Sequence, residues 1–201
     1  MARMLIVVRI PFAGLGPEDI MAQAPIGERE SEADAGFGAH WGRMRVELME
    51  TLNARHAGAS LADVHVFLEG LSVGGRDALR IVTDMASQGS PNCKLVLELV
   101  GRGARLEQTE DPRLLRDRDR LLRDALAAPS LDNRVKARRL YEENERKLVA
   151  ARDAYVAKRI DQAVEADGVA VLSVGPAHDV EKLVAADFHV TMLPSALPLN
   201  G

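Results

Sequence analysis

The sequence predicts one α/β domain, residues 1–201, with a largely parallel central sheet flanked by helices. Short runs rich in Val, Ile and Leu alternate with longer stretches whose apolar residues recur at helical spacing, a pattern typical of parallel sheets. Of the 201 residues, 47% are apolar and 28% are charged, which is the composition of a globular protein with one substantial core. No internal repeat or second domain is visible.

The first elements are a strand, a long loop, a helix and a second strand. Met4–Ile10 is an uninterrupted apolar run of the kind that parallel sheets bury on both faces. Residues 15–38 are acidic and contain several glycines, so we expect a loop or a flap over a site. Apolar residues at helical spacing predict a helix over Trp41–Arg55, and Val64–Leu68 is the second predicted strand.

Helices dominate the middle of the chain. A helix is expected from about Asp77 to Gln88, and another from Pro91, which suits a first helical turn, to about Val100. Ala104–Thr109 is predicted to be a short polar strand. Two helices then follow at 112–127 and 131–166, with their many charges mostly on solvated faces.

The C-terminal part returns to the sheet. Val169–Val174 is an apolar strand that runs into Gly175-Pro176-Ala177-His178. A helix over Asp179–Ala185 and a last strand over Phe188–Leu193 complete the domain, and residues 195–201 are expected to be a tail.

The composition limits the classes of binding partner and the cellular compartment that we expect for this protein. A net charge of -4 and 3% aromatic residues argue against a nucleic-acid partner, which needs a basic face and stacking surfaces. No run is long and apolar enough to span a bilayer, and the N-terminal run lacks the features of a secretory leader. Cys93, the single cysteine, excludes an internal disulfide and fits a packed helical position. We therefore expect a cytoplasmic protein without a membrane partner.

The candidate site lies at the carboxyl ends of the predicted strands. Ligands of open α/β sheets bind there, because loops and helix N-termini converge at that edge. The polar residues at these ends are more numerous than solubility requires, and they are Arg9, Glu69, Glu107, Glu110, Asp111 and His178.

His178, and Arg152 from the helix before the last apolar strand, each have both a structural and a functional interpretation. His178 is either a neighbour of a helix cap, without chemistry, or a general base, metal ligand or oxyanion donor. Arg152 lies near the buried face of its helix, beside Asp153, and needs a partner. It forms either a structural ion pair, or a clamp for an anionic group or for Glu69 or Glu107.

The other histidines carry weaker signals. His65 and His189 lie inside predicted strands and are interpreted as satisfied structural residues. His40 follows the glycine-bearing segment, so a closing flap could bring it to a ligand. The sequence has no Walker A loop, GxGxxG, GxSxG or HExxH motif, so the mechanisms tied to those motifs have no support.

Two motifs resemble the TraB/Tiki, erythromycin-esterase and ChaN-like superfamily. They are Arg152-Asp153-Ala154-Tyr155-Val156-Ala157 and Gly175-Pro176-Ala177-His178, with Glu69 in the place of the carboxylate after an earlier strand. The resemblance covers mainly residues 145–185. It implies an α/β fold with a hydrolytic or metal-dependent site, for which a divalent metal is a candidate cofactor.

The first strand departs from that superfamily. Arg9-Ile10-Pro11 stands where its members place a histidine or glutamate motif. Within the resemblance, His178 would need Glu69, Glu107 or His40 to replace the missing group.

Three functions follow from these observations. The first is a hydrolase acting on an ester, amide or similar bond of a small molecule, with His178, Glu69, Arg152 and Asp153 as its acid–base site. Arg9, His40, Glu107 and Glu110 would then contact the substrate. The second is a binder of an anionic metabolite or cofactor in the same pocket, without turnover. The third is a homo-oligomer or other assembly that uses the charged helices of 112–150 as its interface.

Overall fold

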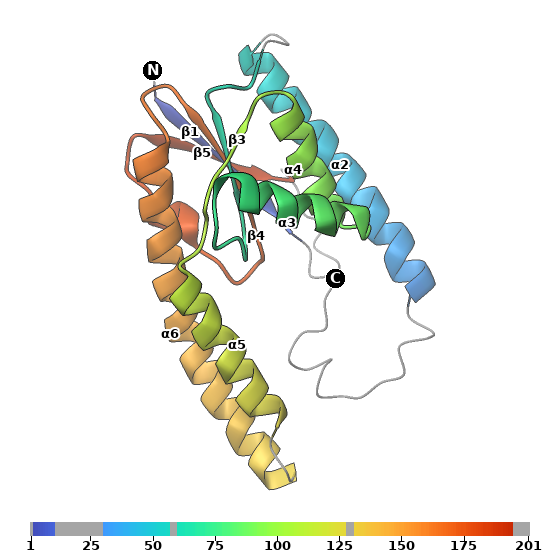
Figure 1. Ribbon diagram of the computed structural model, residues 1–201, viewed down its shortest axis with the longest axis vertical. Coiled ribbons are helices and arrows are strands. Elements are labelled where there is room, and N and C mark those ends of the chain that lie inside the picture. The colour runs from blue at the N-terminus through green and yellow to red at the C-terminus, as the bar shows by residue number, and fades with distance from the viewer. Residues whose placement is uncertain (1, 11–29, 57–59, 128–130, 195–201) are drawn as a thin grey trace.

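A five-stranded parallel sheet forms the centre of the computed structural model, which describes residues 2–10, 30–56, 60–127 and 131–194 (Figure 1). The strand order is β3-β2-β4-β1-β5, and every neighbouring pair is parallel. The strands are β1 Arg3–Arg9, β2 Val64–Leu68, β3 Arg105–Leu106, β4 Val169–Val174 and β5 Phe188–Leu193. The predicted α/β fold with a largely parallel sheet is confirmed.

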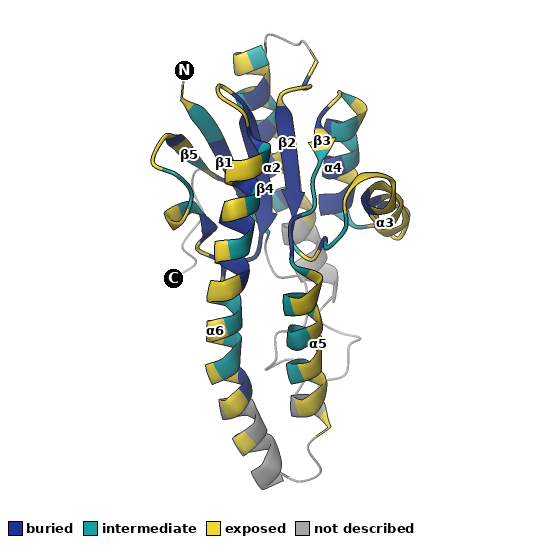
Figure 2. Ribbon diagram, turned by 60° about the vertical axis from the view of Figure 1, so that its left-hand side comes forward, coloured by how far each residue is buried: buried dark blue, intermediate teal, exposed yellow. Residues whose placement is uncertain are grey.

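Helices cover both faces of this sheet. They are α2 Glu30–His56, α3 Gly75–Ser87, α4 Pro91–Gly101, α5 Pro112–Leu126 and α6 Leu131–Ala163, with a short 3-10 turn, η1, at Val180–Lys182. Helices α2, α3 and α4 pack on one face, and the C-terminal half of α6 packs on the other with η1. Figure 2 shows that α5 and the first half of α6 extend together beyond the carboxyl edge of the sheet.

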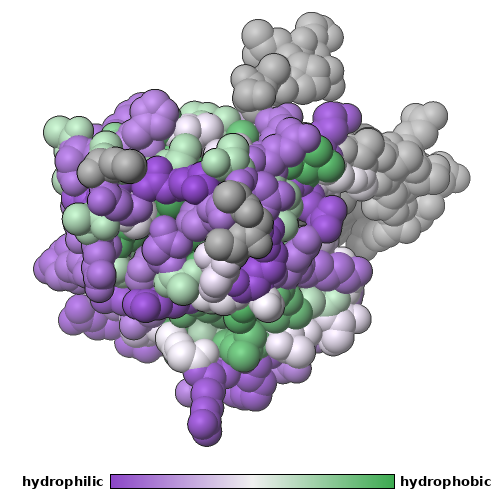
Figure 3. Space-filling view, turned by 90° about the horizontal axis from the view of Figure 1, so that it is seen from above, coloured by the Kyte–Doolittle hydropathy of each residue, from purple (hydrophilic) through white to green (hydrophobic). Residues whose placement is uncertain are grey.

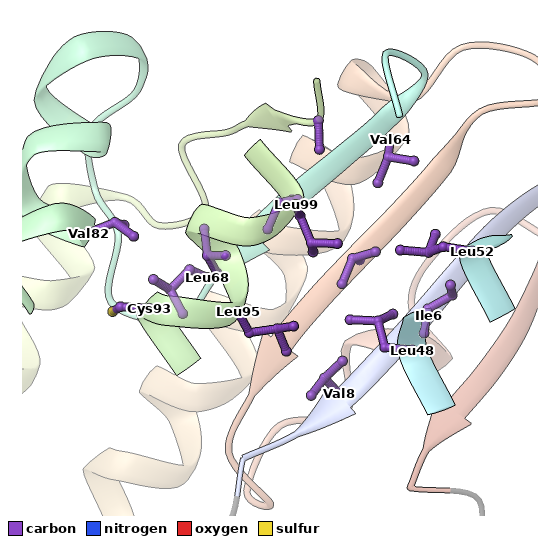
Figure 4. Close-up of a cluster of buried hydrophobic side chains, with 14 of the residues drawn as sticks. Ile6, Val8, Leu48, Leu52, Val64, Leu68, Val82, Cys93, Leu95 and Leu99 are labelled. Atoms are coloured by element: carbon purple, nitrogen blue, oxygen red, sulfur yellow. The ribbon is translucent and has the colours of Figure 1, made fainter. Parts of the chain in front are cut away.

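The larger core lies between the sheet and α2, α3 and α4. Side chains alternate between the two faces of a strand, so Ile6 and Val8 of β1 point to this core. Leu48 of α2 and Leu95 of α4 meet them there (Figure 4). Each fully buried aliphatic side chain of this kind stabilises the fold by about 1.5 to 3 kcal/mol.

The smaller core lies between the opposite face and α6. Leu5 and Val7 of β1 contribute to it from the sheet. Val156 and Ile160 of α6 and Val164, the residue after its end, follow one another at intervals of four, so they form a single apolar stripe. Burial of this stripe fixes the rotation of α6, and with it the direction of every other side chain on the helix.

The structure corrects the prediction of a loop or flap over residues 15–38. Residues 30–38 belong to α2, which therefore begins well before Trp41. Residues 15–29 lie outside the described part, as does the expected tail at 195–201. Glycine weakens a helix by only about 1 kcal/mol, so Gly36 and Gly38 were poor grounds for predicting a loop.

Two other elements are shorter than expected. The strand predicted over Ala104–Thr109 pairs only at Arg105–Leu106, because the chain then turns across the end of β2. There the amides of Thr109 and Glu110 both donate to the carbonyl of Leu71. The helix predicted over Asp179–Ala185 is only the turn η1, because the chain must reach the start of β5 within a few residues.

The remaining helix ends lie within a few residues of their predictions, and α6 stops at Ala163 rather than at 166. None of the described helices combines the length and the apolar character that a membrane span needs. The end of the molecule opposite the projecting helices has a mainly hydrophilic surface with scattered apolar areas (Figure 3).

Gly103 gives a stability test of the turn between α4 and β3. Its φ is +102°, and an added Cβ would lie 2.7 Å from the Ser60 hydroxyl. We expect Gly103→Ala to lower the free energy of unfolding by about 1 to 3 kcal/mol in urea titrations. Gly101→Ala is the control, because Gly101 ends α4 with open space around its Cβ position. Equal stability of the two variants would contradict this account.

Candidate functional site

The candidate site is built where three segments meet at the carboxyl edge of the sheet. Glu69 directly follows β2, and His178 lies four residues after the end of β4. Strands β2 and β4 are neighbours in the sheet, so their following loops are adjacent. Helix α6 passes over these loops and supplies Arg152 and Asp153, which share its buried side. The structure thus brings together the Arg-Asp and Gly-x-x-His motifs.

Asp153, His178 and Glu69 form a hydrogen-bonded series. The Nδ1 atom of His178 bonds to Oδ1 of Asp153, and Nε2 bonds to Oε1 of Glu69 at 3.1 Å. The second oxygen of Asp153 accepts from the amide of Asp179 at 2.8 Å, and the second oxygen of Glu69 accepts from that of Gly175 at 2.8 Å. The imidazole is therefore fixed by two carboxylates, each of which is anchored on the loop after β4.

Arg152 continues the series to a second buried carboxylate. Its Nε and Nη2 donate to the two oxygens of Glu110 at 2.8 and 2.5 Å, and Nη2 also donates to Glu69 at 3.1 Å. Glu110 is only 1% exposed and also accepts from the amide of Gly70 at 3.2 Å. We call these five side chains, Asp153, His178, Glu69, Arg152 and Glu110, the charge network.

The pKa values follow from burial and from these contacts. Burial by itself raises the pKa of Glu69, but His178, the Gly175 amide and Arg152 together outweigh it and lower the pKa to about 2. Burial likewise lowers the pKa of His178, but its bonds to Asp153 and Glu69 raise it to about 9. For Arg152, the attraction of Glu110 and Glu69 outweighs burial and raises the pKa further. At neutral pH, His178 is thus an imidazolium that donates from both nitrogens.

Access to the charge network is through Glu69. Its side chain is 20% exposed, whereas the side chains of the other four members are at most 5% exposed. A small molecule that approaches the carboxyl edge of the sheet therefore meets the Glu69 carboxylate first.

Arg9 holds the loop that carries His178. Its Nη1 donates to the carbonyls of Gly175 and His178 at 3.1 and 2.6 Å, and its Nη2 donates to Glu181 at 2.7 Å. The sequence predicted a ligand contact for Arg9, but in the structure its guanidinium is occupied by this loop. The contact of Glu181 with Arg9 was not predicted, although the position of Glu181 in the turn after His178 could have indicated that it lies near this loop.

Glu107 and His40 lie apart from the charge network. Glu107 bonds to Nδ1 of His65 at 2.8 Å and lies 3.8 Å from Arg159. His65 is thus the buried, hydrogen-bonded residue that its strand position predicted. His40 belongs to α2, on the opposite face of the sheet from α6, so no flap within the described residues carries it. His189, which was interpreted as a satisfied structural residue like His65, is instead exposed on the edge strand β5.

A row of polar contacts made by α6 was not predicted from the sequence. Tyr155 bonds to the side chain of Gln108, and Arg159 donates to the carbonyl of Gln108, each at 3.3 Å. With Arg152 they occupy positions i, i+3 and i+7 of α6, which is one helix face. This spacing in the sequence could have indicated that the three residues share a helix face. Their partner Gln108, however, lies in the turn after β3, which was predicted to be part of a strand.

No cluster of three or more His, Cys, Asp or Glu side chains within the described residues could hold a metal ion. No family model, curated protein or solved structure matches the chain. The resemblance to the TraB/Tiki, erythromycin-esterase and ChaN-like superfamily accordingly stays a prediction.

Removal of Arg152 tests the cost of the buried charges. Arg152→Met leaves Glu110 without its cation, so we expect a loss of about 3 to 5 kcal/mol in the free energy of unfolding. The control Arg159→Met removes a half-buried arginine whose carboxylate partner is at 3.8 Å, and it should cost about 1 kcal/mol or less. The double variant Arg152→Met/Glu110→Met should recover most of the loss. A double variant as unstable as the single one would refute the ion-pair account.

The raised pKa of His178 predicts a pH-dependent stability. Its folded-state pKa of about 9 exceeds the ordinary 6.5, so its contribution is complete below pH 6.5 and is lost as the pH rises through 9. We therefore expect wild type to exceed His178→Gln in Tm at pH 6, and the difference to shrink toward pH 10. A difference that stays constant or grows over this range would show that His178 is not held as an imidazolium.

Proposed function

We propose that this chain is a small-molecule-processing enzyme, a hydrolase that acts on an ester, amide or similar bond at the carboxyl edge of its sheet. The observation that carries the proposal is the hydrogen-bonded series Asp153, His178 and Glu69, which ends in the accessible carboxylate. A charged acid and a charged base in direct contact, at the edge where α/β sheets bind ligands, are suited to transferring protons to and from a substrate.

Glu69 and His178 each carry out one of the proton transfers of the reaction. Glu69 accepts a proton from a water molecule as the water oxygen bonds to the carbonyl carbon of the substrate. In the same step, the imidazolium of His178 gives its Nε2 proton to the leaving oxygen or nitrogen as the scissile bond breaks. The proton on Glu69 then returns to Nε2 across their 3.1 Å contact, which restores the starting state.

The low pKa of Glu69 is compatible with this role because the two groups are coupled. The imidazolium is one of the charges that keep the pKa of Glu69 at about 2. When His178 passes its proton to the leaving group, that charge disappears and Glu69 becomes the stronger base. Asp153 orients the ring through Nδ1, and Arg152 stabilises negative charge on its neighbour Glu69 or on the substrate.

The alternative is a binder of an anionic metabolite that uses Arg9, Arg152 and His178. Each of these groups already contacts a carboxylate or a carbonyl, so an anion would have to displace Glu69 or Glu181. A metabolite that raises the Tm of the protein without being turned over would favour this alternative over the hydrolase.

The test is hydrolysis of a panel of para-nitrophenyl esters and anilides by wild type and two variants. Glu69→Gln keeps an oxygen for the Gly175 amide but removes the base, so kcat/KM should fall by about 100-fold or more. Glu107→Gln is the matched control, a carboxylate at the same edge that pairs with a histidine, and its kcat/KM should stay within about twofold of wild type.

The pH profile provides a second readout. Because the imidazolium is the acid, kcat/KM should decline as the pH rises through about 9. Equal activity of the two variants, or activity that increases through this range, would overturn the assignment of Glu69 and His178.

A further inference from the structure

The loop after β4, residues 175–179, carries three of the groups that shape the candidate site. Besides the imidazole of His178, it provides the amides of Gly175 and Asp179, which donate at 2.8 Å to the carboxylates on either side of that imidazole. The loop's own backbone bond, from the amide of His178 to the carbonyl of Gly175, is long at 3.4 Å. The geometry of the site therefore depends on support from outside the loop.

Arg9 supplies that support from the neighbouring strand. It is the last residue of β1 and lies level with Val174, the last residue of β4. Its Nη1 donates to the carbonyls of Gly175 and His178 at 3.1 and 2.6 Å, and its Nη2 donates to Glu181 of η1 at 2.7 Å. One guanidinium thus ties the loop at three points, with charge-assisted hydrogen bonds that are roughly twice as strong as neutral ones.

Arg9 acts on the imidazole through the loop and not by contact with the ring. Within the described residues its hydrogen bonds go to the two carbonyls and to Glu181, and both side chains are only 15% exposed. The ring of His178 is held by one bond to Asp153 and one to Glu69. Hydrogen bonds weaken steeply when their geometry is lost, so a shift of the loop by about 1 Å would misalign both.

We propose that Arg9 is the positioning residue of the loop after β4, and that its clasp on the two carbonyls keeps the imidazole of His178 between Asp153 and Glu69. The arginine that the sequence assigned to the substrate thus acts on the protein's own loop. Its effect on the rate rests on the proposed hydrolysis. Its effect on the imidazole does not, because that effect can be measured without any substrate.

Arg3 provides a matched control on the same strand. Its side chain is 14% exposed, and it likewise bonds to one carboxylate, that of Asp187, and to two carbonyls, those of Asp161 and Val164. It lies at the amino end of β1, however, at the opposite edge of the sheet from the candidate site. Arg3→Met and Arg9→Met therefore remove similar sets of contacts, of which only the second holds the loop.

NMR titration of the His178 ring in the folded protein is the first readout, with the signal assigned by its absence from His178→Gln. In Arg9→Met, we expect the pKa of His178 to fall from about 9 toward the ordinary 6.5, because the imidazole loses its alignment with both carboxylates. In Arg3→Met the pKa should stay at about 9. A pKa that is unchanged in folded Arg9→Met, or that falls equally in Arg3→Met, would overturn the inference.

The second readout is kcat/KM for the para-nitrophenyl substrate that wild type hydrolyses best. Arg9→Met should lower it by about 10- to 100-fold, mainly through kcat, and Arg3→Met by no more than about twofold. An equal loss in the two variants would contradict a positioning role. If wild type hydrolyses none of the panel, the proposed hydrolase fails, while the titration still decides the role of Arg9.

A second pair of variants covers the case in which Arg9→Met does not fold. Arg9→Lys is then compared with Arg3→Lys, since lysine keeps the charge but lacks the planar fork that reaches all three acceptors. The pKa of His178 should again fall in the first variant and stay unchanged in the second. The same pKa in both would count against the clasp.

Discussion

The ion pair between Arg152 and Glu110 is the contact on which the candidate site depends. Both side chains are almost fully buried, so neither charge is tolerable without the other. Arg152 comes from α6 and Glu110 from the turn after β3, and their bond pins the helix over the carboxyl ends of β2 and β4. Asp153 is the next residue along α6, and the same anchoring brings it to His178.

Charge alternation explains how five ionisable groups share one buried region. Along the charge network the signs run negative, positive, negative, positive, negative, and each ion has an opposite neighbour within hydrogen-bonding distance. Removing a middle member would place two like charges side by side. The protonation of His178 is therefore a requirement of its neighbours Asp153 and Glu69 rather than a property of the residue alone.

The sequence predicted the elements better than it predicted the contacts. Apolar runs such as Val169–Val174 have one plausible conformation, and strand-end residues such as Glu69 and His178 follow from them. The order of the strands in the sheet cannot be predicted from these runs. It is the adjacency of β2 and β4 that brings Glu69 to His178. Glu107 and Glu110 looked equivalent in the sequence. A turn across the end of β2 sends Glu110 to Arg152 and leaves Glu107 with His65.

The second half of helix α6 carries both the apolar residues that pack on the sheet and the charged pair Arg152 and Asp153. A rotation of α6 would remove Val156 and Ile160 from the core and separate Arg152 from Glu110, at a cost of several kcal/mol. The apolar contacts and the ion pair thus set the same rotation of α6, and that rotation brings Asp153 to His178.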